Sequence, residues 1–263
     1  MPPGPFRLPQ LLIGTPLANQ GAASNVHYFG GPVLSHVKVQ VLYWGAVPAD
    51  LKPRLESFYQ DLVHSDYIDQ LTEYNTDKLK IERGEMLGAL QIQPKNTSAR
   101  LIQADIEQEL EYQLASKLIP KADSNTLYMI HFDDRIVIEI SYGLSCSAWY
   151  ADHEVYRSAL FGSVYYSVFP CGENLASVDE LTVAASHELA EAITDPEAPL
   201  SGQTPAFPSG WLTPELQEIG DLCPWYMTKL SGTSTEHEVQ KEWLNSTSSC
   251  NEARFKTSNA VYE

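Results

Sequence analysis

Residues 177–196, with the sequence SVDELTVAASHELAEAITDP, predict a helix from about Val178 to Thr194. Ser177 and Glu180 form an S-x-x-E capping box immediately before a run of residues that favour helices. The helix is expected to end at Asp195-Pro196, because a proline disfavours the helical conformation in the residue that precedes it. The loop that follows is predicted to extend to Gly210.

Two side chains of this helix can bind the same metal ion. His187 and Glu191 are four residues apart and therefore project from one face, about one turn apart. Glu188 lies roughly 100° further round the helix. The H-E-x-x-H motif of metallopeptidases has this geometry, with its glutamate as general base. Glutamates at four-residue spacing are also ordinary on surface helices, so the motif alone is not decisive. An apolar stripe on the opposite side predicts that His187 faces a cleft, and it consists of Leu181, Ala185, Leu189 and Ala192.

A second acidic segment, Glu218-Ile219-Gly220-Asp221, follows about thirty residues downstream and supplies the oxygen ligands that the helix lacks. We assign Glu218 as the third ligand and Asp221 as the partner of the second ring nitrogen of His187. The reverse assignment stays open. We expect one Zn²⁺ per chain. Mn²⁺ or Ca²⁺ are alternatives at an oxygen-rich site, although a histidine ligand argues against calcium.

The expected chemistry is hydrolysis of internal peptide bonds in a peptide or protein substrate. A metal-bound water attacks the carbonyl, and Glu188 acts as general base. His153 is the best candidate for stabilising the oxyanion, ahead of Tyr226, His237 and His27. One neutral histidine and two carboxylates leave Zn²⁺ formally neutral, so hydrolysis is expected to be slower than at a histidine-rich site.

The remaining pattern predicts an α/β fold of the zincin type: a mixed twisted sheet, the active-site helix packed on it, and a C-terminal subdomain. Residues 1–30 are interpreted as an extended or disordered arm. Residues 31–263 are expected to form one catalytic domain, with the cleft between about 31–195 and 196–263. Strands are predicted at 37–43, 127–132, 135–140 and 164–169, of which the second and third form a hairpin or two consecutive strands.

Two further helices follow from apolar residues at helical spacing. The first contains Leu55, Phe58, Tyr59, Leu62 and Val63, with Asp50 as its cap and Pro53 in its first turn. The second contains Ile102, Ile106, Leu110 and Leu114 and is expected to end at Pro120.

Composition limits the partners and the compartment. The 263 residues carry a net charge of −17, which repels nucleic acid and anionic membrane surfaces, and we expect a monomer. Four cysteines without C-x-x-C spacing favour two disulfides, and two Asn-x-Ser/Thr sites favour an extracellular protein. The first 20 residues contain no signal-peptide core. Earlier removal of a signal, another export route or retention in the cell all remain open.

Between about Tyr28 and Cys250 the sequence resembles bacterial and fungal relatives of the plant phosphate-induced, EXORDIUM-like proteins. The resemblance is strongest in the helix segment 186–196 and in the E-x-x-D-x-C segment 218–223. The other matching residues are Tyr28-Phe29-Gly30-Gly31-Pro32-Val33, Ser145-Cys146 with His153, Trp211, and Val239-Gln240-Lys241-Glu242-Trp243.

The resemblance implies a secreted protein in which Cys223 pairs with Cys250 and Cys146 pairs with Cys171. Many plant members lack the H-E-x-x-E residues, which this chain keeps. A second hypothesis follows: a non-catalytic extracellular interaction protein whose metal and disulfides brace the fold.

Overall fold

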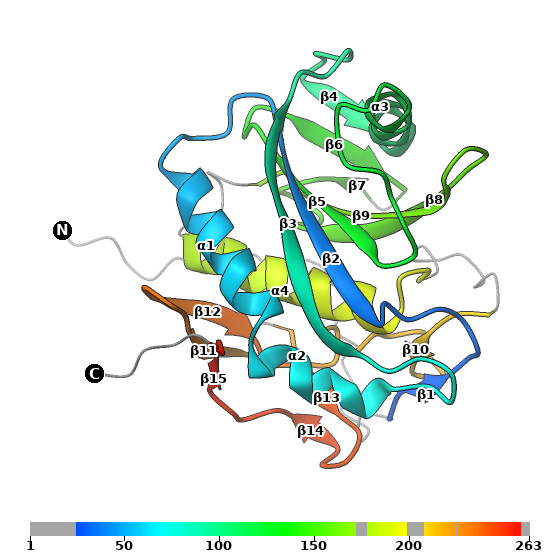
Figure 1. Cartoon of the computed structure of the whole chain (residues 1–263), viewed down its shortest axis with the longest axis vertical. Helices are drawn as coiled ribbons and strands as arrows, with labels where there is room; N and C mark the ends of the chain where they lie inside the picture. Colours follow the sequence, from blue (N-terminus) through cyan, green and yellow to red (C-terminus); the bar gives the residue numbers. More distant parts are fainter. Residues whose placement is uncertain (1–24, 142, 172–177, 199–207, 225, 259–263) are drawn as a thin grey trace.

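The computed structural model describes residues 25–141, 143–171, 178–198, 208–224 and 226–258. Its centre is a five-stranded sheet in the order β3-β2-β5-β9-β8, with α1 and α4 on one face and α3 on the other (Figure 1). Four strands are parallel, and the edge strand β8 is antiparallel to β9. The mixed sheet between helices confirms the α/β class. The strands are β2 (His36–Trp44), β3 (Glu82–Ile92), β5 (Thr126–Phe132), β8 (Asp152–Ser158) and β9 (Gly162–Phe169).

The two faces of the sheet carry separate apolar cores. Along β2, Val39 and Val41 pack toward α1 and α4, whereas Leu42 and Trp44 pack toward α3. Successive side chains of a strand point to opposite faces, so a strand covered on both sides is apolar at nearly every position. The period of two in residues 37–43 correctly predicts this strand.

The predicted helices form, with some corrections at their ends. They are α1 (Leu51–Val63), α3 (Gln103–Ala115) and α4 (Val178–Thr194), accompanied by the short α2 (Asp66–Gln70) and η1 (Leu71–Tyr74). Asp50 precedes α1, but its side chain makes no capping hydrogen bond. The helix α3 ends at Ala115 rather than Pro120, since Lys117 adopts a left-handed φ of 58°. Ile102 is 49% exposed and lies outside the buried stripe. Ser177 of the predicted capping box and residues 199–207 of the predicted loop lie outside the described residues.

The predicted hairpin at 127–140 is wrong. The strand β5 belongs to the central sheet, whereas β6 (Val137–Ile140) pairs with β4 (Arg100–Ile102) and β7 (Gly143–Leu144) in a separate sheet. The two strands are consecutive in sequence but not neighbours. The Asp133 carboxylate binds Arg135 and the Ala46 amide, which fixes the turn between them.

The folded part begins before residue 31. The strand β1 (His27–Tyr28) pairs with β10 (Trp211–Leu212), and Val26 is buried. A Cβ on Gly31 would lie 2.5 Å from the Ser209 backbone, so only glycine fits this contact. The predicted arm therefore does not include residues 25–30, and residues 1–24 lie outside the described part. A two-residue strand is too short to show a period.

The C-terminal residues cover the side of α4 on which the sequence predicts a cleft. The strands β11 (Met227–Ser231), β12 (Glu236–Gln240) and β15 (Phe255–Lys256) form one small sheet, and β13 (Trp243–Leu244) pairs with β14 (Ser249–Cys250). β12 lies beside α4, where Thr182 Oγ1 donates to Glu238 O at 2.7 Å and Gln240 N donates to Ser186 Oγ at 2.9 Å. Every residue of α4 from Leu181 to Thr194 is buried, so His187 does not face an exposed cleft. Among the described residues, no helix combines the length and apolar composition needed to cross a membrane.

Candidate metal centre

The helix α4 holds three of the predicted site residues in one cluster. His187 Nε2 lies 3.1 Å from Glu191 Oε2 and 3.9 Å from Glu188 Oε1. His187 and Glu191 are 1% and 3% exposed. The 3.6-residue period of the helix brings the residues at 187 and 191 together, as the motif predicts.

The edge strand β8 adds His153 to the same cluster. His153 Nδ1 lies 3.2 Å from Glu188 Oε2 and 3.8 Å from Glu191 Oε2. Glu191 Oε2 is therefore within 4 Å of a ring nitrogen from each histidine. From the sequence, His153 was expected to have another role, that of oxyanion donor. Because position 153 lies far along the chain from α4, no spacing rule predicts its contacts with Glu188 and Glu191.

Glu218 and Asp221 both reach the cluster, on different sides. Donor atoms of Asp221, His187 and Glu191 all lie within 4.8 Å of one another, and so do donor atoms of His153, Glu188 and Glu191. Glu218 instead lies behind His153, with Oε1 3.5 Å from Nε2. This geometry is compatible with the reverse assignment, in which Asp221 rather than Glu218 is the third ligand.

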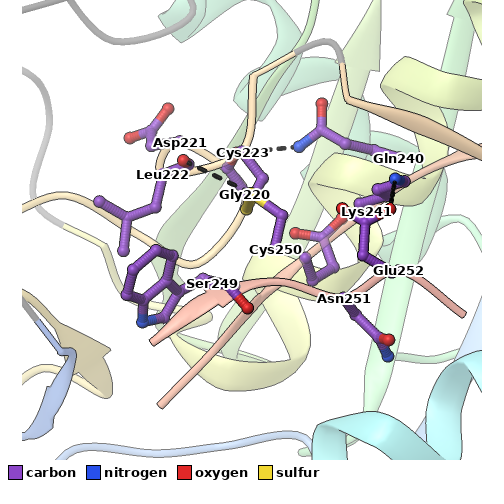
Figure 2. The surroundings of a disulfide bond; sticks show 12 residues. Gly220, Asp221, Leu222, Cys223, Gln240, Lys241, Ser249, Cys250, Asn251 and Glu252 are labelled. Atoms are coloured by element: carbon purple, nitrogen blue, oxygen red, sulfur yellow. Dashed lines mark hydrogen bonds and ion pairs between the residues drawn. A yellow bond between two sulfur atoms is a disulfide. The ribbon is translucent and has the colours of Figure 1, made fainter. Parts of the chain in front are cut away.

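The second ring nitrogen of His187 contacts Gln240, a residue to which the sequence gave no role. Gln240 Nε2 lies 2.7 Å from His187 Nδ1 and donates to Gly220 O at 2.9 Å, the contact drawn in Figure 2. An amide nitrogen can only donate, so in this arrangement Nδ1 accepts and the ring proton is on Nε2. Gln240 Oε1 is buried and has no hydrogen-bond partner in the described part of the chain. If the side-chain amide of Gln240 were flipped, Oε1 would accept a hydrogen bond from a protonated Nδ1 of His187.

The second ring nitrogen of His153, Nε2, is a hydrogen-bond donor, whereas His187 Nδ1 is an acceptor. Nε2 lies 3.2 Å from the main-chain oxygen of Asp195, which can only accept. Nε2 therefore carries the proton, and Nδ1 faces Glu188 and Glu191 with its lone pair when the ring is neutral. Burial alone would lower the pKa of His153, but the surrounding carboxylates, Glu218 first, raise it well above its usual value.

Gly220 allows the main chain to lie in close contact with His187 and Glu191. A Cβ on Gly220 would lie 2.5 Å from His187 Nδ1 and 2.8 Å from Glu191 Oε1. The next residue, Asp221, donates its main-chain N–H to Glu191 Oε1 at 3.0 Å. This bond fixes one oxygen of Glu191 and leaves Oε2 toward the histidines.

The buried acids exceed the buried bases. Burial raises the pKa of Asp195 to about 6, of Asp221 to about 7 and of Glu242 to about 8, and it raises the pKa of Glu218 well above its usual value. Burial alone would lower the pKa of His187, but Glu191 and Glu188 raise it to about 10. Glu218 Oε1 and Glu242 Oε2 have no hydrogen-bond partner among the described residues. Paired imidazoles, excess carboxylates and partnerless acceptor oxygens suit a divalent cation.

Both disulfides implied by the resemblance are present, and one fastens a segment of the site. Cys146 pairs with Cys171, and Cys223 pairs with Cys250. Figure 2 shows the second disulfide joining segment 220–223 to β14, next to Gln240. Cys223 N also donates to Gly220 O at 2.9 Å. Two disulfides indicate an oxidising environment.

The other candidate histidines and tyrosine have different surroundings. His237 Nε2 lies 3.0 Å from Asp61 Oδ2, and Tyr226 is 58% exposed. His27 is exposed on β1. In contrast, sequence reasoning gave no role to Gln240, Gly220 or Glu242, although all three belong to the segments that carry the family resemblance.

Comparisons of the chain with protein families, with curated proteins and with solved structures give no match.

Proposed function

We propose that this protein is a zinc-dependent peptidase whose cation is bound by His187 and Glu191 of α4. The buried contacts that Glu188 and Glu191 make with the imidazoles of both His153 and His187 carry the proposal. Such a donor set matches the nitrogen and oxygen ligands of catalytic zinc. An acid from segment 218–221 completes the surroundings, and the geometry favours Asp221 over Glu218 for this role.

A zinc ion bound by these residues would supply an acidified water and polarise the substrate carbonyl. Glu188 is placed to accept a proton, because its two oxygens face His153 and His187 at 3.2 and 3.9 Å and its burial keeps bulk water away. The same carboxyl group then delivers the proton to the departing amine.

A peptide is the substrate class that the sheet edge favours. Within the described residues, β8 pairs only with β9, so its other edge can pair with an extended chain. His153 lies on this strand, which puts an added peptide next to the cluster.

Burial of the cluster supports a second candidate function, a structural cation in a non-catalytic protein. Structural zinc sites are closed by protein ligands, whereas catalytic sites keep a position for water. His187, Glu188 and Glu191 are all buried, which agrees with a closed structural site.

The peptidase needs access for its substrate. Glu218 and Asp221 are partly exposed and mark the side from which a substrate can enter.

Secretion and membership of the EXORDIUM-like family form part of the proposal. The two disulfides support an oxidising compartment, and the segments that carry the resemblance contribute Gln240 and Gly220 to the surroundings of His187. Zinc bound inside such a disulfide-braced domain suits an extracellular enzyme.

The substitution Glu188→Gln tests the function. Zinc-loaded wild type should cleave casein or a broad peptide library, and Glu188→Gln should reduce the rate by about 10²–10⁴-fold with zinc still bound. Glu180→Gln is the matched control, because Glu180 lies in the first turn of the same helix and outside the cluster. It should leave the rate unchanged.

If zinc-loaded wild type is as inert as Glu188→Gln on the library while still binding one zinc per chain, the peptidase proposal fails and the structural cation is favoured. If neither protein binds zinc by elemental analysis, both candidate functions fail.

A further inference from the structure

The sequence contains two Asn-x-Ser/Thr sites, Asn96-Thr97-Ser98 and Asn245-Ser246-Thr247. N-linked glycosylation uses sites of this kind, and the attached glycan is bulky and needs an acceptor at the surface. Both sites satisfy the pattern equally well. The side-chain amides of the two asparagines, however, have different surroundings in the fold.

The side-chain amide of Asn245 makes a double hydrogen bond with the main chain of Val26. Val26 N donates to Asn245 Oδ1 at 2.9 Å, and Asn245 Nδ2 donates to Val26 O at 2.8 Å. Trp243 Nε1 also donates to Oδ1, at 3.2 Å. Val26 is 1% exposed and directly precedes β1. The amide of Asn245 therefore fastens the residues before β1 to the hairpin of β13 and β14.

A sugar on Asn245 would break this double hydrogen bond. The glycosidic link makes the side-chain amide secondary, and secondary amides strongly prefer the trans form. In that form the substituent lies on the same side of the C–N bond as the amide oxygen. It replaces the hydrogen that Asn245 donates to Val26 O. A glycan at Asn245 and the observed contact with Val26 therefore exclude each other.

Asn96 lies between β3 and β4 and has the opposite surroundings. Its Oδ1 accepts a hydrogen bond from Ser98 N at 3.0 Å, which forms an Asx turn. Within the described part of the chain, no hydrogen bond engages Asn96 Nδ2. Asn96 is partly exposed, and Thr97 and Ser98 are exposed. A substituent on Nδ2 therefore breaks no hydrogen bond of the protein.

The segment that carries Asn96 belongs to the side of the sheet covered by α3. Lys95 N donates to Glu109 Oε2 of α3 at 2.9 Å. The helix α3 lies on the sheet face opposite α4 (Figure 1). A glycan on Asn96 is thus attached on the far side of the sheet from the cluster around His187.

We propose that Asn96 is an N-glycosylation site of this protein and that the folded chain carries no glycan at Asn245. The donor is an oligosaccharide linked to a lipid diphosphate. Asn96 Nδ2 forms a bond with the anomeric carbon, the bond between that carbon and the diphosphate breaks, and Nδ2 loses one proton. The lipid diphosphate is the leaving group. This inference rests on the export that belongs to the proposed function and does not depend on the metal.

Expression of the full chain behind a cleavable export signal in a eukaryotic host tests the proposal. An amidase that releases N-glycans converts the carrier asparagine to aspartate, and peptide mass spectrometry then identifies its position. Secreted protein should show aspartate at position 96 and asparagine at position 245 after this treatment, and asparagine at both positions before it. Chains retained in the cell are analysed in parallel, so that chains that fail to fold are also read.

Two alanine substitutions form a matched pair. Each removes the hydroxyl group that an Asn-x-Ser/Thr site requires and keeps the asparagine. Ser98→Ala should abolish the shift in gel mobility that the glycan causes, and Ser98→Thr should keep it. Thr247→Ala should migrate like the wild type.

The outcomes separate this inference from the metal-dependent function. Secreted wild type without a glycan at position 96 overturns the inference, and so does secreted wild type with a glycan at position 245. Retention of all chains in the cell overturns the export on which it rests. A glycan at position 245 that occurs only in retained chains supports it, because such chains lack the contact with Val26. Elemental analysis of zinc in the same secreted protein tests the metal centre separately.

Discussion

His237 and His153 are both buried beside carboxylates, but the two groups differ in their balance of acids and partners. Asp61 receives His237 Nε2 at 3.0 Å, Thr233 N at 3.0 Å and Thr233 Oγ1 at 2.7 Å. That pair contains one acid and one base, and both oxygens of the acid have donors. Around His153 the acids outnumber the bases.

The difference shows how a structural histidine–carboxylate pair can be told from a cation site. In the pair formed by His237 and Asp61, hydrogen bonds hold the pKa of Asp61 low against the effect of burial. Beside the candidate metal centre, burial raises the pKa of Glu242 to about 8. A complete pair is stable by itself, whereas excess buried acids need a proton or a metal ion.

Removal of the cation should produce the largest effect. A ligand that binds only the folded state at about 1,000 times its Kd contributes about 4 kcal/mol. Wild type in excess zinc should therefore lose about that much stability when the zinc is chelated, as measured by thermal and urea unfolding. His237→Gln should start from a lower stability but lose the same amount on chelation. If chelation does not change the unfolding curve, the cluster around His187 and Glu191 binds no stabilising cation and is a structural group like the pair of His237 and Asp61.

Loss of a disulfide should be nearly as large and should distinguish the two cross-links. Each closes a loop of similar length, with sequence separations of 25 and 27 residues, so each removal should cost about 3.5 kcal/mol. The double substitution Cys223→Ser and Cys250→Ser should also weaken zinc binding, because it frees the segment that carries Asp221. The control, Cys146→Ser with Cys171→Ser, should keep the wild-type zinc affinity. Equal zinc affinity in the two variants would argue against a role for segment 218–223.

The substitution Asp61→Asn should destabilise the protein by about 2 kcal/mol without changing zinc binding. The amide loses the charge that strengthens the hydrogen bonds from His237 and Thr233. Urea unfolding measures the loss, and a chelator competition measures the zinc affinity. A change in zinc affinity above tenfold would show that the two histidine groups are coupled.

Per pH unit, the pH dependence of the chelated protein should be the smallest effect, and it should have opposite signs in the two groups. The folded-state pKa of Glu242 is raised to about 8, so its contribution is complete below its unfolded value of about 4.5 and is lost as pH rises through 8. Asp61 has a lowered pKa, so its contribution is present above its unfolded value and is lost as pH falls.

Stability of the chelated wild type should therefore fall between pH 5 and pH 8, by at most about 1.4 kcal/mol per pH unit from Glu242. Glu242→Gln should show a shallower slope in urea unfolding at pH 6, 7 and 8. An unchanged slope would contradict the raised pKa of this carboxyl group.

The local pattern of the sequence predicts the elements that depend on neighbours in the chain. The helix 178–194 and the strand around Val39 and Val41 follow from periodicity and a terminating proline. The contact between His187 and Glu191 follows from helical spacing. These features need only short-range geometry, which the order of residues contains.

The remainder depends on long-range packing. His153 comes from β8 and Gln240 from β12, and no spacing rule connects either residue with α4. Burial of α4 on all sides depends on the C-terminal strands, whose short segments show no clear period. The edge strand β3 has the same difficulty, because polar and apolar residues mix on an exposed edge.

Gly220 restricts which sequences can build this centre. Its backbone φ does not lie in the left-handed region, so turn preferences do not explain the residue. The restriction is steric, since a Cβ at this position would lie 2.5 Å from an imidazole nitrogen and 2.8 Å from a carboxylate oxygen. Searches for distant relatives should therefore weight the small residue between the two acids as heavily as the histidines, and a chain with a bulkier residue there cannot form the same pocket wall.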